Sequence, residues 1–132
     1  MSTTMTDLPP DLRFTRDHEW VRAEGDAWAV GITRFAVDQL GDITMVELPR
    51  QGDLVTKGQR FGTIESVKSV SDLYAPISGK VTRVNAALRD QPELVNSDCY
   101  GAAWMIEITA SEPHEVDELL DPAAYGELLA QG

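Results

Sequence analysis

Lys68 is the residue of this chain whose setting best suits chemistry. It lies in the run Glu65-Ser-Val-Lys-Ser-Val-Ser71, between two segments that read as short strands, Arg60–Glu65 and Ser71–Ala75. Small hydroxyl residues beside the lysine leave room for another protein's active site, and Val67 and Val70 favour an extended backbone that points the amine outward. The pattern predicts a lysine at the tip of a tight hairpin, where an enzyme can reach and modify it. An unmodified surface lysine is the competing interpretation, because exposed lysines are common.

Other chemistry finds little support in the sequence. The remaining lysines, Lys57 and Lys80, each adjoin a turn glycine and read as ordinary solvated charges. The two histidines, His18 and His114, have no nucleophile motif near them, and nothing in the sequence brings Cys99 to a histidine. Clustered metal ligands and a glycine-rich phosphate loop are also missing from the sequence pattern. We therefore expect no catalytic residues and no metal site. Any chemistry would then depend on a group attached covalently to Lys68.

Composition favours one folded domain. The chain has 132 residues, of which 42% are apolar, enough to bury a core. Its 11 basic and 22 acidic side chains give a net charge of -11, which disfavours binding to nucleic acid or anionic membranes. The single cysteine excludes an internal disulfide, and the sequence offers no signal peptide or apolar span. We expect a cytoplasmic protein with a flexible tail over residues 1–11 and a single domain over 12–132.

Frequent glycines divide the chain into short segments, which favours a mainly β fold. A hairpin is predicted where His18–Arg22 and Trp28–Ile32 flank Glu24-Gly25-Asp26, with Trp28, Val30 and Ile32 on one face. Further strands are predicted over Ile43–Leu48, Lys80–Val84 and Trp104–Ile108, the last with Trp104, Ile106 and Ile108 on one side.

Helices are expected in two places. Thr33 to Leu40 has an N-cap candidate in Thr33 and a stop signal in Gly41. Near the end, Ser111 is a candidate cap for a helix that carries Val116 and Leu119. Asp121-Pro122 then begins a further helix through Tyr125 and Leu129.

The lysine segment, Glu65-Ser-Val-Lys-Ser-Val-Ser-Asp-Leu-Tyr-Ala-Pro-Ile-Ser-Gly79, resembles the lipoyl-lysine segment of the H proteins of the glycine cleavage system. Further motifs match this family in order, and the resemblance runs from about Leu12 to Tyr125. They are His18-Glu-Trp20, Val30-Gly-Ile-Thr33 with Ala36, Leu40-Gly-Asp42, Val46-Glu-Leu-Pro49, Val84-Asn85, Pro92-Glu-Leu-Val-Asn96, Tyr100 and Trp104. Local departures are Ala103, Cys99 and Met45, where the family usually has glycine, proline and an aromatic residue.

The resemblance implies a barrel-sandwich hybrid, two small antiparallel sheets facing each other with short flanking helices. It also implies a non-catalytic carrier with lipoate joined by an amide to Lys68. The implied partners are glycine decarboxylase with pyridoxal phosphate, aminomethyltransferase with tetrahydrofolate, and the FAD enzyme dihydrolipoamide dehydrogenase. A lipoate ligase or a lipoyl or octanoyl transferase would attach the arm. The protein would shuttle the aminomethyl group of glycine between the first two enzymes.

In the family, the loaded arm folds into a surface cleft of the carrier. We hypothesise that carboxylates lining this cleft bind the protonated amine of the cargo. Glu19 and Asp72 are the candidates, with Glu65 as a weaker one, because each lies in a matched motif beside the arm. Solvated surface acids are the alternative interpretation of all three.

Rival interpretations remain. Lipoyl domains of 2-oxo acid dehydrogenases carry Asp-Lys-Ala at the tip, and biotin carriers carry Met-Lys-Met, whereas this chain has Val67-Lys68-Ser69. A carrier that receives lipoyl or octanoyl groups and donates them to other complexes is a further alternative. A free-standing enzyme is the least favoured class, because the sequence supplies no catalytic constellation of its own.

Overall fold

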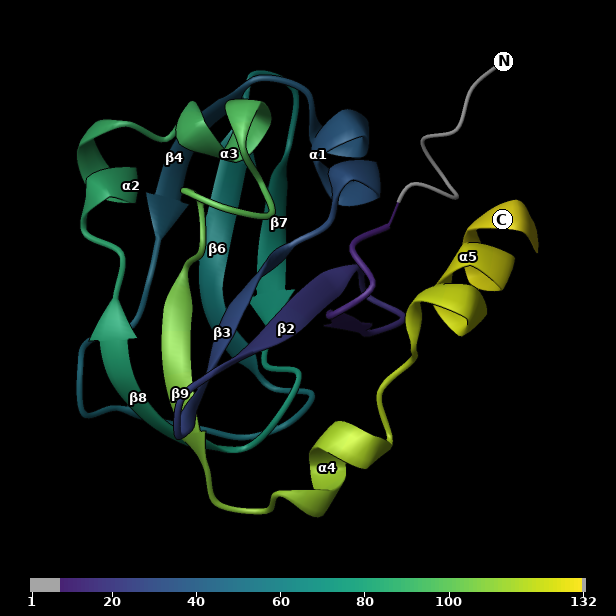
Figure 1. Cartoon of the computed structure of the whole chain (residues 1–132). Helices are drawn as coiled ribbons and strands as arrows, with labels where there is room; N and C mark the ends of the chain where they lie inside the picture. Colours follow the sequence, from purple (N-terminus) through teal and green to yellow (C-terminus); the bar gives the residue numbers. More distant parts are fainter. Residues whose placement is uncertain (1–7, 132) are drawn as a thin grey trace.

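The computed structural model describes residues 8–131. Two antiparallel sheets form its body, one of six strands in the order β1-β2-β3-β9-β8-β5 and one of three in the order β4-β6-β7 (Figure 1). The strands are β1 (Arg13–Phe14), β2 (Glu19–Glu24), β3 (Ala27–Ile32), β4 (Ile43–Glu47), β5 (Leu54–Val55), β6 (Arg60–Ser66), β7 (Val70–Tyr74), β8 (Gly79–Val84) and β9 (Ile106–Ala110). The helices are α1 (Arg34–Leu40), α2 (Ala87–Asp90), α3 (Leu94–Ser97), α4 (His114–Asp117) and α5 (Pro122–Gln131). Residues 1–7 of the tail expected over 1–11 lie outside the described part of the chain.

The main core lies between the two sheets. Val30, Ile106 and Ile108 from the six-stranded sheet pack in one buried cluster with Ile64 and Leu73 from the three-stranded sheet. Each of these side chains is almost fully removed from water, which supplies most of the driving force for folding. This cluster fixes the distance between the sheets and therefore the position of the β6–β7 hairpin.

A second buried cluster lies beneath the C-terminal helix. It joins Leu12, Phe14 and Trp20 to Tyr125 and Leu129 of α5. The rings of Phe14 and Tyr125 stack with centroids 4.5 Å apart. The indole N–H of Trp20 donates to the Cys99 carbonyl at 3.0 Å, so the buried ring keeps its hydrogen bond. This cluster fastens α5 to the strands that carry Glu19.

The predicted hairpin and first helix are confirmed. Strands β2 and β3 pair antiparallel around Gly25, which has a positive φ of 63°. Helix α1 starts at the predicted cap, where Thr33 Oγ1 accepts the Ala36 N–H at 3.3 Å. It ends at Gly41, whose N–H donates to the Val37 carbonyl at 2.9 Å and whose φ of 82° turns the chain out of the helix.

Two expectations near the end of the chain are wrong. Trp104 precedes strand β9 and packs with the second cluster, whereas Ile106 and Ile108 belong to the first. Ser111 does not cap α4, because the cap position is Pro113 and makes no side-chain hydrogen bond. The predicted Asp121 cap is confirmed, since its carboxylate accepts the Ala124 N–H at 2.8 Å.

Substituting Gly79 with alanine is expected to lower the free energy of unfolding by about 3 kcal/mol. Gly79 pairs with both Val55 and Ala110 in the six-stranded sheet. An added Cβ would overlap the backbone carbonyl of Thr109 and lie 2.7 Å from Ile108 Cγ2. Urea denaturation checks this, with Gly25→Ala as the control. A Cβ added at Gly25 would have no neighbouring atom within 4 Å. This substitution should therefore cost only about 1 kcal/mol, from the positive φ of Gly25. Equal losses in the two variants would contradict the close approach at Gly79.

Candidate functional site

Lys68 lies at the exposed turn between β6 and β7. Ser66 organises this turn, because its backbone N–H donates to the Ser69 carbonyl at 2.8 Å while its hydroxyl oxygen accepts the Lys68 and Ser69 N–H groups at 3.3 and 3.2 Å. Val67 and Val70 on either side are 68% and 64% exposed. Within residues 8–131, the Lys68 ammonium makes no hydrogen bond or ion pair. The predicted presentation of the amine at a hairpin tip is confirmed.

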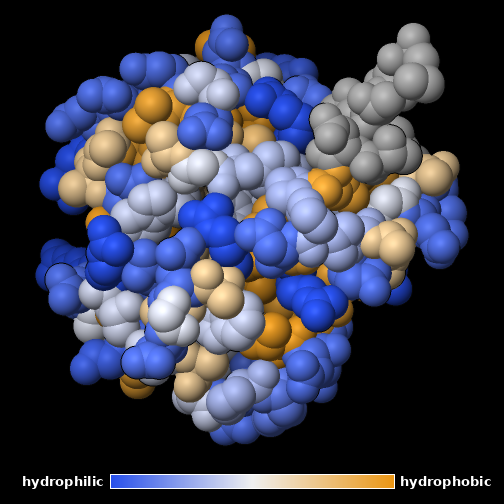
Figure 2. Space-filling view, in the orientation of Figure 1, coloured by the Kyte–Doolittle hydropathy of each residue, from blue (hydrophilic) through white to orange (hydrophobic). Residues whose placement is uncertain are grey.

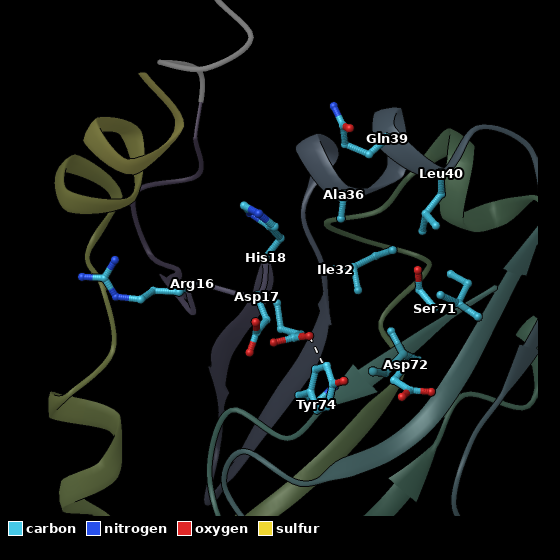
Figure 3. Close-up of a pocket in the computed structure, with 13 residues that line it drawn as sticks. Arg16, Asp17, His18, Ile32, Ala36, Gln39, Leu40, Ser71, Asp72 and Tyr74 are labelled. Carbon is cyan, nitrogen blue, oxygen red and sulfur yellow. Dashed lines mark hydrogen bonds between the residues drawn. The ribbon is translucent and has the colours of Figure 1, made fainter. Parts of the chain in front are cut away.

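A cleft of about 320 Å³ opens beside this turn. One wall is β7, which begins two residues after Lys68, and another is the last turn of α1, which contributes Gln39 and Leu40 (Figure 3). Helix α1 ends at Gly41, close to the Lys68 side chain. The apolar part of the lining comes from Ile32, Ala36, Leu40, Ile64 and Leu73, and the polar part from Arg16, Asp17, His18, Glu19, Gln39, Ser71, Asp72 and Tyr74. The cleft therefore offers apolar surface for an aliphatic chain and charged groups for its end.

Glu19 is the buried carboxylate of the cleft, with only 2% of its surface exposed. Its Oε1 accepts the Thr15 hydroxyl at 2.7 Å, and its Oε2 accepts the Tyr74 N–H at 3.3 Å, dashed in Figure 3. Burial raises the pKa of Glu19 to about 8, against the opposing effect of these hydrogen bonds. At neutral pH the group therefore holds a proton, and a cation entering the cleft would favour its release.

The structure brings two of the three predicted carboxylates into the cleft. Asp72 is exposed and stands at the rim on β7, while Glu19 lies deep within. Glu65 lies on β6 between Met45 and Val70 in register, and it is not among the residues that line the cleft. Glu19 and Asp72 thus form a buried and an exposed acid in the same cavity.

His18 is a cleft residue that sequence reasoning missed. It adopts a positive φ of 72°, rare for a residue with a side chain, and its Nδ1 lies 2.8 Å from the Tyr125 hydroxyl. That hydroxyl also lies 2.8 Å from Thr33 Oγ1. Burial lowers the pKa of His18, with Asp17 opposing the shift. The signal in the sequence was the matched motif His18-Glu-Trp20, which contains His18 but does not show that its side chain lines the cleft.

The pH dependence of stability should report the buried Glu19. Its pKa is about 8 in the folded protein against 4.5 for the unfolded chain, so the folded state binds its proton more tightly. Between these values the unfolded state holds fewer protons, and stability falls as the pH rises. Glu19→Gln should remove this slope, so its stability relative to the parent should increase as the pH rises between these two values, by up to about 1.4 kcal/mol per pH unit. Urea denaturation of both proteins across this range checks it, and parallel curves would rule out the raised pKa.

The rest of the described chain offers no competing reaction centre. Burial raises the pKa of the Cys99 thiol to about 11, which keeps it from acting as a thiolate at neutral pH. Among residues 8–131, no three His, Cys, Asp or Glu side chains come close enough to hold a metal ion. None of the helices described is both long enough and apolar enough to cross a membrane.

Comparison with known proteins gives a consistent result. Residues 12–132 match the family model described as "Glycine cleavage H-protein". The glycine cleavage system H protein of Myxococcus xanthus is 52% identical over 92% of this chain and 95% of the relative, and that of Symbiobacterium thermophilum is 50% identical over 97% and 100%. A solved H-protein structure from Mycobacterium marinum aligns with a TM-score of 0.86 at 40% identity, covering 93% of this chain and 99% of that one. The structural match confirms the predicted barrel-sandwich hybrid.

Proposed function

The chain belongs to the glycine cleavage H-protein family and is a lipoyl carrier of the glycine cleavage system, and we propose that Lys68 is its attachment residue. One observation supports this most: the Lys68 amine is exposed at a turn beside the cleft and has no hydrogen-bond or ion-pair partner among residues 8–131. Lys57, by contrast, is paired with Glu118 at 2.6 Å. The family comparison favours this role over the lipoate-trafficking alternative.

The residues around Lys68 fit a lipoyl arm. A lipoyl group on this lysine would be a long aliphatic chain, and the cleft presents Ile32, Leu40 and Ile64 to it. Amide formation removes the lysine charge, so the modified side chain loses the penalty for entering an apolar space. When bound, the lipoyl group supplies the redox and group-carrier chemistry, and the protein supplies position and access.

We further propose that Glu19 and Asp72 hold the protonated amine of the cargo. Glu19 lies at the depth of the cleft and Asp72 at its rim, so the two acids can meet a cation from different sides. Arrival of the ammonium lowers the pKa of Glu19 and favours the carboxylate, which then accepts a charge-assisted hydrogen bond. The cleft would in this way shield the amine from water.

Glu19→Gln and Asp72→Asn should each speed the spontaneous release of formaldehyde and ammonia from the loaded carrier. Loss of one charge-assisted hydrogen bond should increase the rate of this release roughly tenfold. The increase in release rate should be larger for Glu19→Gln, because Glu19 is buried and its interaction with the cargo amine would be better shielded from solvent. Asp26→Asn is the matched control, because Asp26 is an exposed acid in the β2–β3 turn. Decay rates equal to those of the control would remove both carboxylates from this role.

The proposed partners follow from the system to which the family belongs. They are glycine decarboxylase, aminomethyltransferase and dihydrolipoamide dehydrogenase, together with a lipoate ligase or transferase that attaches the arm. A net charge of -11 and the largely hydrophilic face in Figure 2 suit reversible docking onto basic surfaces. We propose that the chain contributes no catalytic group of its own and that residues 12–132 act as one carrier domain.

Loading by the first partner tests this function. The unmodified protein is treated with a lipoate ligase, lipoate and ATP, then with glycine decarboxylase, its pyridoxal phosphate and glycine. Intact-protein mass should rise by one lipoyl group and then by one aminomethyl group. Lipoylated protein that never accepts the second group would refute the proposed role in glycine cleavage.

A further inference from the structure

The Lys68 turn contacts a second loop, Gly41–Ile43, which follows α1 and includes the first residue of β4. The Val67 N–H donates to the Asp42 carbonyl at 3.0 Å, a contact between the turn and the loop outside the sheet pairing. The Lys68 side chain passes close to Gly41, because a Cβ placed there would lie 3.5 Å from Lys68 Cε. The loop is thus the surface on which the lysine and its turn lie.

Asn96 of α3 holds this loop from both sides of Asp42. Its side-chain N–H donates to the Gly41 carbonyl at 2.9 Å, and its Oδ1 accepts the Ile43 N–H at 2.9 Å. The Arg34 guanidinium in turn donates to the Asn96 carbonyl at 2.8 Å. In Figure 1, α1, α3 and the β6–β7 turn lie at the same end of the molecule. A single amide therefore fixes two successive peptide groups of the loop.

We propose that Asn96 is a positioning residue for the arm. It fixes the Gly41–Ile43 loop, and through the Asp42 carbonyl it fixes the backbone immediately before Lys68. This inference rests on the proposed attachment of lipoate to Lys68. Among the described residues, Asn96 makes no hydrogen bond to Lys68 and does not line the cleft, so we expect it to act through the loop.

The loop also sets where the arm goes. Gly41 directly follows Leu40, and Leu40, Gln39 and Ala36 line the cleft. A lysine side chain that runs across Gly41 is therefore directed along the last turn of α1 toward the cavity. Releasing the loop would leave the turn folded by its own Ser66 hydrogen bonds but free to change direction relative to the cleft.

Asn96→Ala and Asn85→Ala form a matched pair for the test. Asn85 is also an amide that holds a loop, since it donates to the Ala102 and Trp104 carbonyls at 2.8 and 2.7 Å, but its side-chain hydrogen bonds within residues 8–131 do not reach the Lys68 turn or the Gly41–Ile43 loop. The two variants remove comparable hydrogen bonds. A difference between Asn96→Ala and Asn85→Ala therefore reports the position of the Lys68 turn and not the general stability of the protein.

Two measurements decide the matter. In Asn96→Ala, hydrogen exchange of the Val67 amide should accelerate about tenfold or more. The kcat for lipoylation by a lipoate ligase should fall about tenfold with KM within about twofold, because docking is retained while the amine is misaligned. Asn85→Ala should change neither the exchange rate of the Val67 amide nor the kcat for lipoylation. Asn96→Asp, which keeps the acceptor for Ile43 N–H but cannot donate to Gly41, should give an intermediate result and replaces the alanine variant if that one does not fold.

Normal lipoylation and normal Val67 exchange in the Asn96 variants would overturn the inference. Equal losses in the Asn96 and Asn85 variants would overturn it too, because they would reflect stability alone. Failure of the parent protein to accept lipoate at Lys68 is a different outcome, which refutes the proposed function together with this role.

Discussion

Lys68→Arg is expected to abolish lipoylation and, with it, every glycine-dependent reaction of the reconstituted system. Arginine keeps the positive charge but stays protonated at any working pH, so it cannot form the amide. The Lys68 side chain is exposed and makes no hydrogen bond or ion pair with any residue that the structure describes, so we expect the free energy of unfolding to change by less than about 0.5 kcal/mol. Intact-protein mass after ligase treatment and release of carbon dioxide from glycine are the measurements.

Lys57→Arg and Lys80→Arg are the controls for this result. Lys57 forms an ion pair that arginine can also make, and Lys80 is an exposed residue of β8. Both variants should be lipoylated like the parent protein. A Lys68→Arg protein that still gains a lipoyl group would show that the arm is attached elsewhere.

Tyr125→Ala should cost about 4 kcal/mol of unfolding free energy, the largest stability effect we expect. The ring is fully buried and stacks on Phe14, and its hydroxyl lies within hydrogen-bond distance of His18 and Thr33. Tyr125→Phe keeps the packing and loses only the hydroxyl, for which we expect about 1 kcal/mol. Urea denaturation of the two variants separates packing from hydrogen bonding.

Leu54→Ala is the control for Tyr125, because Leu54 is a large apolar residue that is 81% exposed. It should unfold like the parent protein. A Tyr125→Ala protein as stable as the Leu54 variant would mean that α5 is not fastened to the strands by this ring. It would also remove the support that α5 gives to His18 at the wall of the cleft.

Local signals predicted much of the fold. The β2–β3 hairpin follows from alternation around Gly25, and α1 follows from Thr33 and Gly41, because caps and turns are decided by neighbours in the chain. The same holds for the Lys68 turn, where Ser66 supplies the hydrogen bonds. Trp104 was misplaced because alternation alone does not show where a strand begins, and its ring packs with a different cluster.

The cleft depended on contacts that the sequence does not display. Glu19 was named from its motif, but its carboxylate accepts a hydrogen bond from the backbone of Tyr74, 55 residues away. The environment of His18 depends on Tyr125, which is 107 residues away. Asn96 likewise reaches a loop 55 residues earlier in the chain. No periodicity or cap signal encodes such distances, so the acids could be proposed while their arrangement could not.

Peptide mapping of the ligase-treated protein shows directly whether Lys68 carries the lipoyl group. The parent protein is incubated with lipoate ligase, lipoate and ATP, digested with trypsin, and compared with an untreated sample by mass spectrometry. We expect one lipoyl group per chain, found on the peptide that contains Lys68, with Lys57 and Lys80 unmodified. A chain that stays unmodified, or one that carries the group on Lys57 or Lys80, would contradict it.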